Sequence, residues 1–400
     1  MQRIETTQVL VSGGGVAGLG AAAAFGAAGF EVICVDPTPP TTDEADEAAD
    51  LRTTAFLQPA QALLAECGLW DRLADHAAAL RIMRIVDAGG PTPEARLTRN
   101  FKSTEISDLP FGWNLPNWLL RREMVARLAE LRNVSFRPGV ALSGLLTRSS
   151  EARATLSDGQ KVSARLVIGA DGRNSTVRAA CGIGVQATRY GQKALAFAVS
   201  HPTPHDGVST EVHRSGGPFT LVPLPDRNGL PCSAVVWMQT GPEVQRLAAL
   251  PVPDFEAEMT LRSANVLGPL RLLTRRSVWP IISQIADRFD GERTALMAEA
   301  AHVVPPIGAQ GLNMSLADLR CLLELARQTP DALGDAGMLS AYQHRRWPEV
   351  RARVAGIDLL NRASMVGQPI LRDLRAVTLN ALYGLRPLRK TLMKAGLGAT

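Results

Sequence analysis

The first 36 residues alternate between short apolar runs and a segment with helical periodicity. Gln8–Ser12 (QVLVS) predicts a buried strand, Val16–Ala28 carries the small and apolar positions of a helix, and Glu31–Val35 (EVICV) predicts a second strand that ends at Asp36. A strand, a helix and a strand within about 30 residues are typical of a β-α-β unit with parallel strands. The pattern therefore predicts an α/β fold.

Farther along the chain, apolar runs of strand length are separated by Gly and Pro. Four of them predict an antiparallel sheet, at residues 194–201, 208–214, 218–225 and 233–239. Other segments predict strand-turn-helix units at 164–180 and 294–325, helices at 58–66, 121–132, 242–249 and 254–265, and a strand at 277–286. We therefore expect a discontinuous nucleotide-binding domain (1–75, 100–185 and 280–345), an inserted substrate domain (76–99 and 186–279) and a C-terminal helical region (346–400).

Composition and charge exclude several classes of protein. With 400 residues, of which 46% are hydrophobic, the chain is long enough for a large core and two domains, and it is neither disordered nor fibrous. No run of strongly apolar residues predicts a spanning helix. Five scattered Cys without a C-x-x-C argue against zinc and disulfides and fit a reducing cytoplasm. The last 57 residues carry eleven Lys/Arg and three Asp/Glu, so the slightly acidic remainder disfavours a nucleic-acid partner.

A Gly-rich loop joins the first predicted strand to the helix. Gly13 permits a tight turn, Gly15 lets the backbone approach a pyrophosphate, and Gly18 lets the helix pack closely on the strand. The helix N-terminus points backbone N–H groups at the anion. Asp36, at the end of the second strand, supplies an acceptor for a ribose diol. Together these features predict the binding of a dinucleotide, either NAD or FAD.

Two further segments decide between these cofactors. Ala170–Arg178 (ADGRNSTVR) follows an apolar strand, and Glu299–Asn313 (EAAHVVPPIGAQGLN) runs from a strand into a helix. Together with the first motif, over residues 5–350, they resemble the class A flavin monooxygenases, aromatic hydroxylases with the para-hydroxybenzoate hydroxylase-like fold. The resemblance implies an α/β, Rossmann-like FAD-binding domain of the GR2 flavoprotein type, an inserted, mainly antiparallel sheet domain and a C-terminal helical segment. It also implies NAD(P)H as reductant and O2 as oxygen source, through a flavin C4a-hydroperoxide.

The resemblance also assigns roles to particular residues. It implies that Asp171 lies between the FAD pyrophosphate and the NAD(P)H route, that Glu299 holds the ribityl chain, and that Pro306 lies beside the flavin ring. The backbone of residues 311–313 would contact the pyrimidine edge, where a helix N-terminus compensates the negative charge of reduced flavin. The full set of expected FAD contacts is Gly13, Gly15, Ala17, Gly18, Asp36, Arg52, Arg121, Asp171, Gly172, Glu299, Pro306, Gly311, Leu312 and Asn313.

One position departs from the family pattern. The family has Gly-Asp where this chain has Ala298-Glu299, which adds a Cβ close to the cofactor and lengthens the carboxylate side chain by one methylene. We therefore expect altered FAD binding. Because the cofactor performs the chemistry, no catalytic side chain is assigned. The spacing of the His residues predicts no metal site.

Within the family, the chain most resembles the ubiquinone-biosynthesis hydroxylases, at residues 112–117, 120–121, 218–225 and 342–346. The resemblance implies hydroxylation of the aromatic ring of a polyprenylated phenol. Two alternatives stay open. A soluble aromatic-acid hydroxylase would need a cation for the substrate carboxylate, for which the inserted sheet offers Lys193, His213 and Arg214. The departure at residues 298–299 would also suit a non-catalytic FAD-fold scaffold of a quinone-biosynthesis complex.

Several residues have a structural interpretation beside a functional one. His302 is expected to be a structural histidine rather than a group that tunes the flavin. Trp237 and Met238 alternate on one strand, so at most one faces the substrate, and packing is expected for both. The amphipathic, basic tail either packs on the body with a solvated Arg face or contacts an anionic membrane surface or partner enzymes. The expected location is the cytoplasm, with peripheral contact at the inner membrane as the open alternative.

Overall fold

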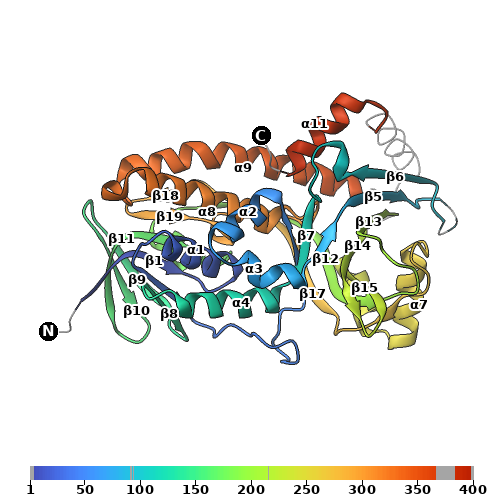
Figure 1. The fold of residues 1–400 in the computed structure, drawn as a ribbon, viewed down its shortest axis with the longest axis horizontal. Helices are drawn as coiled ribbons and strands as arrows, with labels where there is room; N and C mark the ends of the chain where they lie inside the picture. The colour runs from blue at the N-terminus through green and yellow to red at the C-terminus, as the bar shows by residue number, and fades with distance from the viewer. Residues whose placement is uncertain (1–3, 91, 93, 215, 366–382, 398–400) are drawn as a thin grey trace.

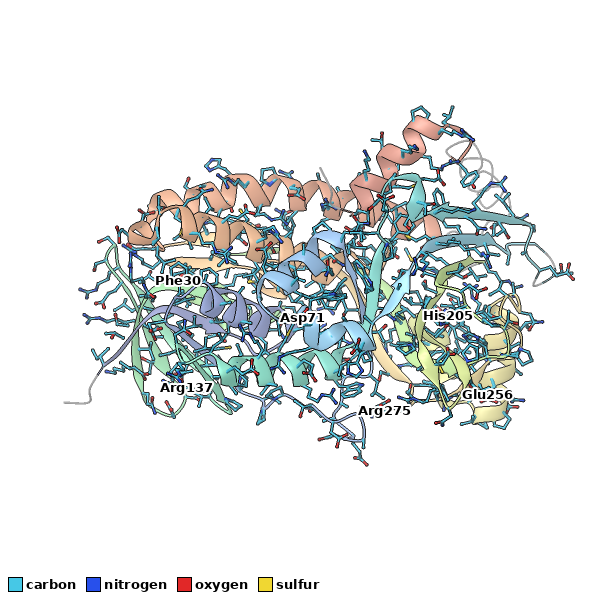
Figure 2. The ribbon with its side chains drawn as sticks, in the orientation of Figure 1. Phe30, Asp71, Arg137, His205, Glu256 and Arg275 are labelled. Carbon is cyan, nitrogen blue, oxygen red and sulfur yellow. The ribbon has the colours of Figure 1, made fainter. Side chains whose placement is uncertain are left out.

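The computed structural model describes residues 4–90, 92, 94–214, 216–365 and 383–397. Two large sheets lie one after the other along the long axis of the molecule, and helix α9 (Ala336–Met365) runs along one side of it (Figure 1). Phe30 and Arg137 belong to the half built on the first sheet, and His205 and Glu256 to the half built on the second (Figure 2). Arg275 lies between the halves, where its guanidinium donates to the carbonyl oxygens of Asp46 and Ala49.

The first sheet is mainly parallel and contains the predicted β-α-β unit. Its order is β18 (Asp290–Gly291), β19 (Thr294–Leu296), β11 (Lys161–Gly169), β1 (Glu5–Ser12), β2 (Val32–Asp36) and β8 (Val134–Pro138), with β10 (Ala152–Leu156) on β11 and β9 (Leu142–Thr147) on β10. Strands β19, β11, β1, β2 and β8 are parallel to one another, whereas β18 and β10 pair antiparallel with β19 and β11. Residues from 16 to 26 of helix α1 (Val16–Ala27) are buried, because α1 is covered by α4 (Asn117–Glu130) and α8 (Gln310–Gln328).

The second sheet is mainly antiparallel, as the sequence predicts. Its order is β20 (His302–Val303), β17 (Ser277–Ala286), β12 (Val185–Ser200), β15 (Leu230–Thr240), β14 (Pro218–Arg227), β13 (Val208–His213), β5 (Ile82–Asp87) and β6 (Leu97–Lys102), with β16 (Arg271–Leu272) on β12. Strand β12 begins nine residues before the predicted run, because residues 185–193 pair with β17 although most of their side chains are exposed. Strands β5 and β6, which the sequence pattern did not predict, extend the sheet beside β13.

One face of the second sheet forms a separate hydrophobic core. Helices α6 (Gly241–Ala249) and α7 (Val252–Arg262) cover it, and aromatic side chains of the strands, including Phe197 and Trp237, pack against Phe255. A small third sheet of β3 (Thr53–Leu57), β7 (Gly112–Pro116) and β4 (Ala78–Leu80) lies beside helices α2 (Gln58–Glu66) and α3 (Trp70–Leu73). The α/β fold with an additional antiparallel sheet confirms the expected fold class.

The C-terminal region is helical where it is described. Helix α9 buries Val350 and Ile357 but leaves Leu360 exposed, and helix α11 (Arg386–Leu397) packs Leu397 against Leu57. The expected amphipathic pattern of the tail also includes the apolar residues Ile370, Leu371, Leu374 and Leu382, which lie outside the described residues. In the described part of the chain, no helix combines the length and the hydrophobicity needed to cross a bilayer.

Candidate functional site

The first Gly-rich loop contains two kinds of glycine. A Cβ on Gly13, whose φ is +118°, would lie 2.2 Å from the carbonyl oxygen of Ala170, and a Cβ on Gly18 would lie 1.9 Å from the carbonyl oxygen of Gly13. The packing of the chain itself therefore requires these two glycines. Gly15 differs, because its φ is −70° and a Cβ there would meet nothing within 4 Å. The space beside Gly15, at the N-terminus of α1, fits an anionic group that approaches the backbone.

Asp36 lies at the carboxyl end of β2, next to this loop. Its Oδ2 accepts a hydrogen bond from the Gly14 N–H at 2.5 Å, and its Oδ1 accepts one from the Thr38 N–H at 2.8 Å. A Cβ on Gly14 would lie 2.7 Å from the Cβ of Asp36, so the loop and the acid are in direct contact. The structure thus brings together the residues expected to hold the pyrophosphate and the ribose. Ala17 lies in the first turn of α1, beside the same space.

Buried Arg178 joins the second motif, at residues 170–178, to the third motif, at residues 299–313. Asp171 follows β11 and accepts hydrogen bonds from the Ser175 hydroxyl at 2.5 Å and from the Val177 N–H at 3.1 Å, at the N-terminus of helix α5 (Thr176–Ala180). Gly172 adopts a φ of +82° and a Cβ there would meet nothing within 4 Å. The Arg178 guanidinium donates to the Ala300 carbonyl at 2.9 Å. The distant segments 171–178 and 299–313 are therefore neighbours in space.

Asp50, which sequence reasoning missed, holds the two expected arginines near one another. Arg52 donates to both carboxylate oxygens of Asp50, at 2.8 and 2.7 Å, and Arg121 lies 3.8 Å from the same carboxylate. Burial alone would raise the pKa of Asp50, but Arg52, Asn117 and Arg121 outweigh it and lower that pKa. The Arg52 guanidinium also stacks 3.8 Å from the centroid of Trp279, which belongs to the second sheet. No short motif surrounds Asp50 or Trp279, so the sequence offered no signal for them.

Glu299 and its neighbour Ala298 occupy a tight turn after β19. Ala298 is buried and adopts a left-handed φ of +55°, a conformation that glycine adopts without steric cost. Glu299 is exposed. The pKa of Arg52 is raised: burial lowers it, but Asp50 raises it by more, and the negative charge of Glu299 adds to the effect of Asp50. The departure from the family's Gly-Asp therefore has a structural consequence, because the alanine is held in a conformation suited to glycine.

The third motif ends at the N-terminus of α8. Ala309 adopts a φ of +57° directly before the helix, and Gly311 has room around its Cα, since the nearest side-chain atom to a Cβ there would be 3.9 Å away on Val304. Asn313 ties this first turn to β3, because its side chain accepts from the Leu57 N–H and donates to the Ala55 carbonyl. The helix N-terminus, including Leu312, thus presents uncompensated backbone N–H groups on a fixed support.

The loop before α8 reaches the second sheet. Pro306 is exposed, and the next residue, Ile307, packs against Ala194, Met238 and Ile281. The loop therefore lies between the nucleotide-binding motifs and one face of the second sheet, which we call the inner face. The side chains of Trp237 and Met238 point to opposite faces, and both are buried, Trp237 in the core under α7 and Met238 on the inner face.

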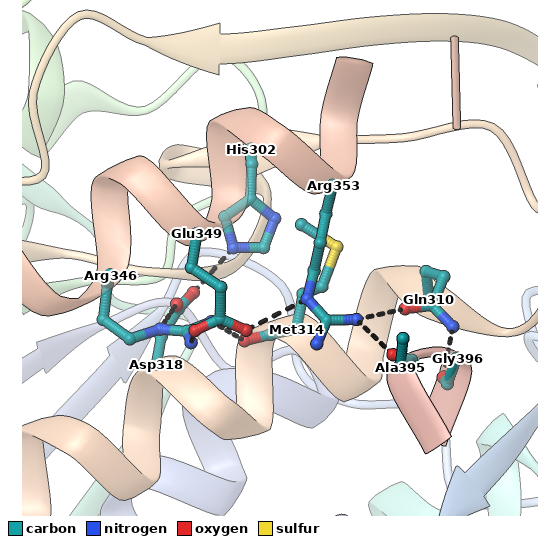
Figure 3. A network of polar contacts seen from close by, with 9 residues as sticks. All are labelled: His302, Gln310, Met314, Asp318, Arg346, Glu349, Arg353, Ala395 and Gly396. Atoms are coloured by element: carbon teal, nitrogen blue, oxygen red, sulfur yellow. Dashed lines mark hydrogen bonds and ion pairs between the residues drawn. The ribbon is translucent and has the colours of Figure 1, made fainter. Parts of the chain in front are cut away.

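A buried ion-pair network fixes α8 to α9 (Figure 3). Asp318 is completely buried and accepts hydrogen bonds from His302 Nε2 at 2.6 Å and from Arg346 Nε at 2.8 Å. Burial opposes ionisation of Asp318, but His302 and Arg346 outweigh it, so the pKa of Asp318 is lowered. His302 is 2% exposed and lies inside this network, which agrees with the structural role expected from the sequence.

The same network continues to the C-terminal helix. Glu349 contacts both Arg346 and Arg353, and Arg353 donates to Gln310 Oε1 at 3.2 Å and to the Ala395 carbonyl at 3.3 Å. Gln310 in turn donates to the Gly396 carbonyl at 3.0 Å (Figure 3). Because Gln310 is the first residue of α8, the chain of contacts links α11 to the turn that carries residues 311–313.

The inserted sheet places the three candidate cations differently. Lys193 alternates with Ala194 on β12 and therefore points away from the inner face. His213 is paired with Glu211, at 2.6 Å between Nε2 and Oε1. Arg214 follows the end of β13. Within the described residues, no group of three or more His, Cys, Asp and Glu residues could hold a metal ion.

Comparisons with known proteins agree with this geometry. The family described as "FAD binding domain" matches residues 6–356. Over 399 residues the chain is 33% identical to "Ubiquinone hydroxylase UbiL" of Rhodospirillum rubrum, covering 98% of this chain and 90% of that protein. It is 26% identical to "3-demethoxyubiquinol 3-hydroxylase" of Escherichia coli, covering 98% and 99%.

The solved structure of p-nitrophenol 4-monooxygenase from Pseudomonas putida has a similar fold. It matches with a TM-score of 0.78 and 19% identity, covering 98% of this chain and 99% of that chain. A structure of PqsL from P. aeruginosa in complex with 2-aminobenzoylacetate matches with a TM-score of 0.76 and 20% identity, covering 94% and 100%. At these identities the likeness shows the shared fold, which is that of flavin-dependent monooxygenases.

Proposed function

The chain belongs to the FAD-binding-domain family that includes the ubiquinone hydroxylases, and from this premise we propose that it hydroxylates the aromatic ring of a polyprenylated phenol in ubiquinone biosynthesis. It is an FAD-dependent monooxygenase, with NAD(P)H as the typical reductant of the family. The names of the UbiL and demethoxyubiquinol relatives support a quinone precursor as substrate. The scaffold and aromatic-acid alternatives have weaker support, since the relatives are named as hydroxylases of quinone precursors.

The residues around the expected cofactor fit FAD. We propose that the space beside Gly15 takes the pyrophosphate, that Asp36 accepts from the ribose, and that Glu299 lies near the ribityl chain. Residues 311–313 would contact the pyrimidine edge, where the positive end of α8 compensates negative charge. Bound FAD supplies the reduction of O2 and the transfer of one oxygen atom. The protein holds FAD and orients the phenol.

The observation that carries the proposed substrate is the contact between the loop at residues 305–309 and the inner face. Ile307 packs there against Ala194, Met238 and Ile281, so the surface beside the expected flavin is apolar. Apolar surface favours a prenylated ring, and burying a benzoate carboxylate there would require a paired cation. Of the three candidate cations, Lys193 points away from this face, and His213, which lies on it, is already paired with Glu211.

The choice between the two substrate classes is testable with purified protein loaded with FAD. We expect 2-prenylphenol to stimulate NAD(P)H oxidation and to be hydroxylated, and 4-hydroxybenzoate to do neither. Stimulation by 4-hydroxybenzoate with product formation, and none by 2-prenylphenol, would contradict the proposed substrate. Rescue of quinone synthesis in a deletion strain is the corresponding test in cells.

We also propose that the domains divide as the sequence analysis expects, except that β6 (Leu97–Lys102) and β17 (Ser277–Ala286) each belong as a whole to the substrate domain. The proposal rests on strand pairing, since β6 pairs with β5 and β17 pairs with β12 of the second sheet. Residues 346–400 would then form the C-terminal helical region, which contacts both units through α9 and α11. Limited proteolysis within residues 186–279 should leave the FAD spectrum of the protein less altered than cleavage within 294–313.

We further propose that the C-terminal region binds the surface of an anionic membrane, such as the inner membrane. In α11, Lys390 and Lys394 are exposed, as is Leu392, at 50%. Exposed basic residues near an anionic surface each contribute about 1 kcal/mol to binding. Replacing Lys390 and Lys394 with Gln should weaken co-sedimentation with vesicles containing phosphatidylglycerol. Unchanged binding would show that this charge reflects composition alone. We propose that the same C-terminal region also contacts other enzymes of quinone biosynthesis.

A further inference from the structure

A row of residues on the inner face leads from the expected flavin position to a histidine. Directly paired residues on neighbouring strands point to the same face, and one such row runs from Ala194 through Met238 and Pro218 to His213. Ala194 and Met238 are the residues that pack against Ile307. His213 is two strands from Met238, a separation of about 10 Å between Cα atoms. His213 therefore shares one face of the sheet with the residues that contact Ile307.

The next residue on the same face of β13 fixes the state of this histidine. Glu211, two positions before His213, lies 2.6 Å from its Nε2 through Oε1, and the side chains are only 22% and 14% exposed. An ionised carboxylate can only accept, so Nε2 carries the ring proton and Nδ1 is left as an acceptor. Nδ1 is buried and makes no hydrogen bond to any residue the structure describes. A buried acceptor without a partner is costly and invites a donor from a ligand.

We propose that His213 accepts the hydrogen bond of the substrate's ring hydroxyl and takes its proton during hydroxylation, with Glu211 as the positioning residue. The inference rests on the proposed function, which supplies FAD, O2 and the reductant. The hydroxyl O–H bond breaks, a bond from the proton to Nδ1 forms, and the electron pair left on oxygen activates the ring carbon ortho or para to it. After oxygen transfer, water accepts the proton that this carbon loses, the C–H electron pair restores the aromatic ring, and the phenolic oxygen recovers its proton from His213.

Several charged groups surround His213, and its Nδ1 is the ring nitrogen proposed to accept a hydrogen bond from the substrate. Glu211 lies on its own strand, and Asp87, paired opposite His213 on β5, is bound by Arg96 at 2.6 Å. Arg214 is next in sequence. From the other face of the sheet, Arg262 of α7 donates to the carbonyl oxygens of Val212 and Gly217. The Glu211 carboxylate lies within hydrogen-bonding distance of the imidazole, at Nε2.

The test compares binding of 2-prenylphenol with binding of its methyl ether, which lacks the donor. Calorimetry with the FAD-loaded protein should give about tenfold tighter binding of the phenol, as expected for one hydrogen bond. His213→Phe should reduce that ratio to less than about threefold with FAD content unchanged. Glu211→Gln should also lower the ratio with FAD content unchanged, because a neutral amide can donate as well as accept and no longer fixes the ring proton on Nε2.

A matched control is His205→Phe, because His205 belongs to the same sheet region but is bonded to the Leu224 carbonyl. It should keep the wild-type ratio. An unchanged ratio in His213→Phe, an equal loss in His205→Phe, or an unchanged ratio in Glu211→Gln would each overturn the assignment of His213 and Glu211. If the wild-type protein binds neither FAD nor any prenylated ring, the proposed function itself fails, and the role of His213 with it.

Discussion

Removing the charge of Asp318 perturbs the network that supports the N-terminus of α8. The Asp318 carboxylate is fully buried between His302, at 2.6 Å, and Arg346, at 2.8 Å. Asp318→Asn preserves the shape of the side chain but leaves the buried Arg346 guanidinium without its only fully buried carboxylate partner among the residues that the structure describes. Breaking one partner of a buried ion pair costs roughly 3–5 kcal/mol. We expect the lower end, about 3 kcal/mol, because Glu349 still pairs with Arg346 from the surface.

The free energy of unfolding is measured from urea titrations followed by circular dichroism at neutral pH. Glu349→Gln is the matched control, because it removes a second carboxylate from the same Arg346, but one whose side chain is 43% exposed. An exposed ion pair contributes less than about 1 kcal/mol, so the control should lose no more than that. If Asp318→Asn costs no more than Glu349→Gln, the buried network does not support α8 as argued.

Three further outcomes follow. Gly15→Val should lower FAD affinity at least about tenfold without changing the urea midpoint, because only a ligand occupies the space that the added side chain would fill. Gly13→Ala should fail to fold, because its Cβ would meet the Ala170 carbonyl. Equal behaviour of the two variants would refute this distinction. The pKa values of Asp50 and Asp318 are lowered from the ordinary 3.8. The two ionised carboxylates therefore stabilise the folded protein fully above that pH, and this stabilisation is lost as the pH falls toward the lowered pKa values. The urea midpoint should therefore drop on acidification, and it should drop less in Asp318→Asn. Ala298→Gly should raise FAD affinity in equilibrium titrations, since glycine adopts the observed φ without strain, and no gain would show that the departure is neutral.

The nucleotide-binding part of the fold could be predicted because its signals are local. The strand, the Gly-rich loop, the helix and Asp36 lie within 36 residues, and the structure places Asp36 against Gly14 as a β-α-β unit requires. Helix α2 begins and ends at the predicted residues, 58 and 66. The inserted sheet was predicted where its strands alternate, and missed at residues 185–193, where polar side chains are exposed although the backbone pairs with β17.

The rest depended on contacts between distant segments. Strands β5 and β6 join the sheet through pairing of Ile82 with Val208, more than a hundred residues away, which no local pattern encodes. Asp50 and Trp279 meet around Arg52 from opposite halves of the molecule. Glu211 and His213 did carry a signal, since a carboxylate and an imidazole two positions apart on a predicted strand share a face. The position of that face relative to the flavin loop, however, required the structure.

The central claim is that this protein uses FAD to insert one oxygen atom from O2 into a prenylated phenol. The most direct measurement supplies isotopically labelled O2 to the purified, FAD-loaded protein with NAD(P)H and 2-prenylphenol, and analyses the product by mass spectrometry. We expect one labelled oxygen atom per product ring, with no product when FAD or the reductant is omitted. A protein that binds no FAD after reconstitution, or that releases only hydrogen peroxide with every prenylated phenol supplied, would contradict it.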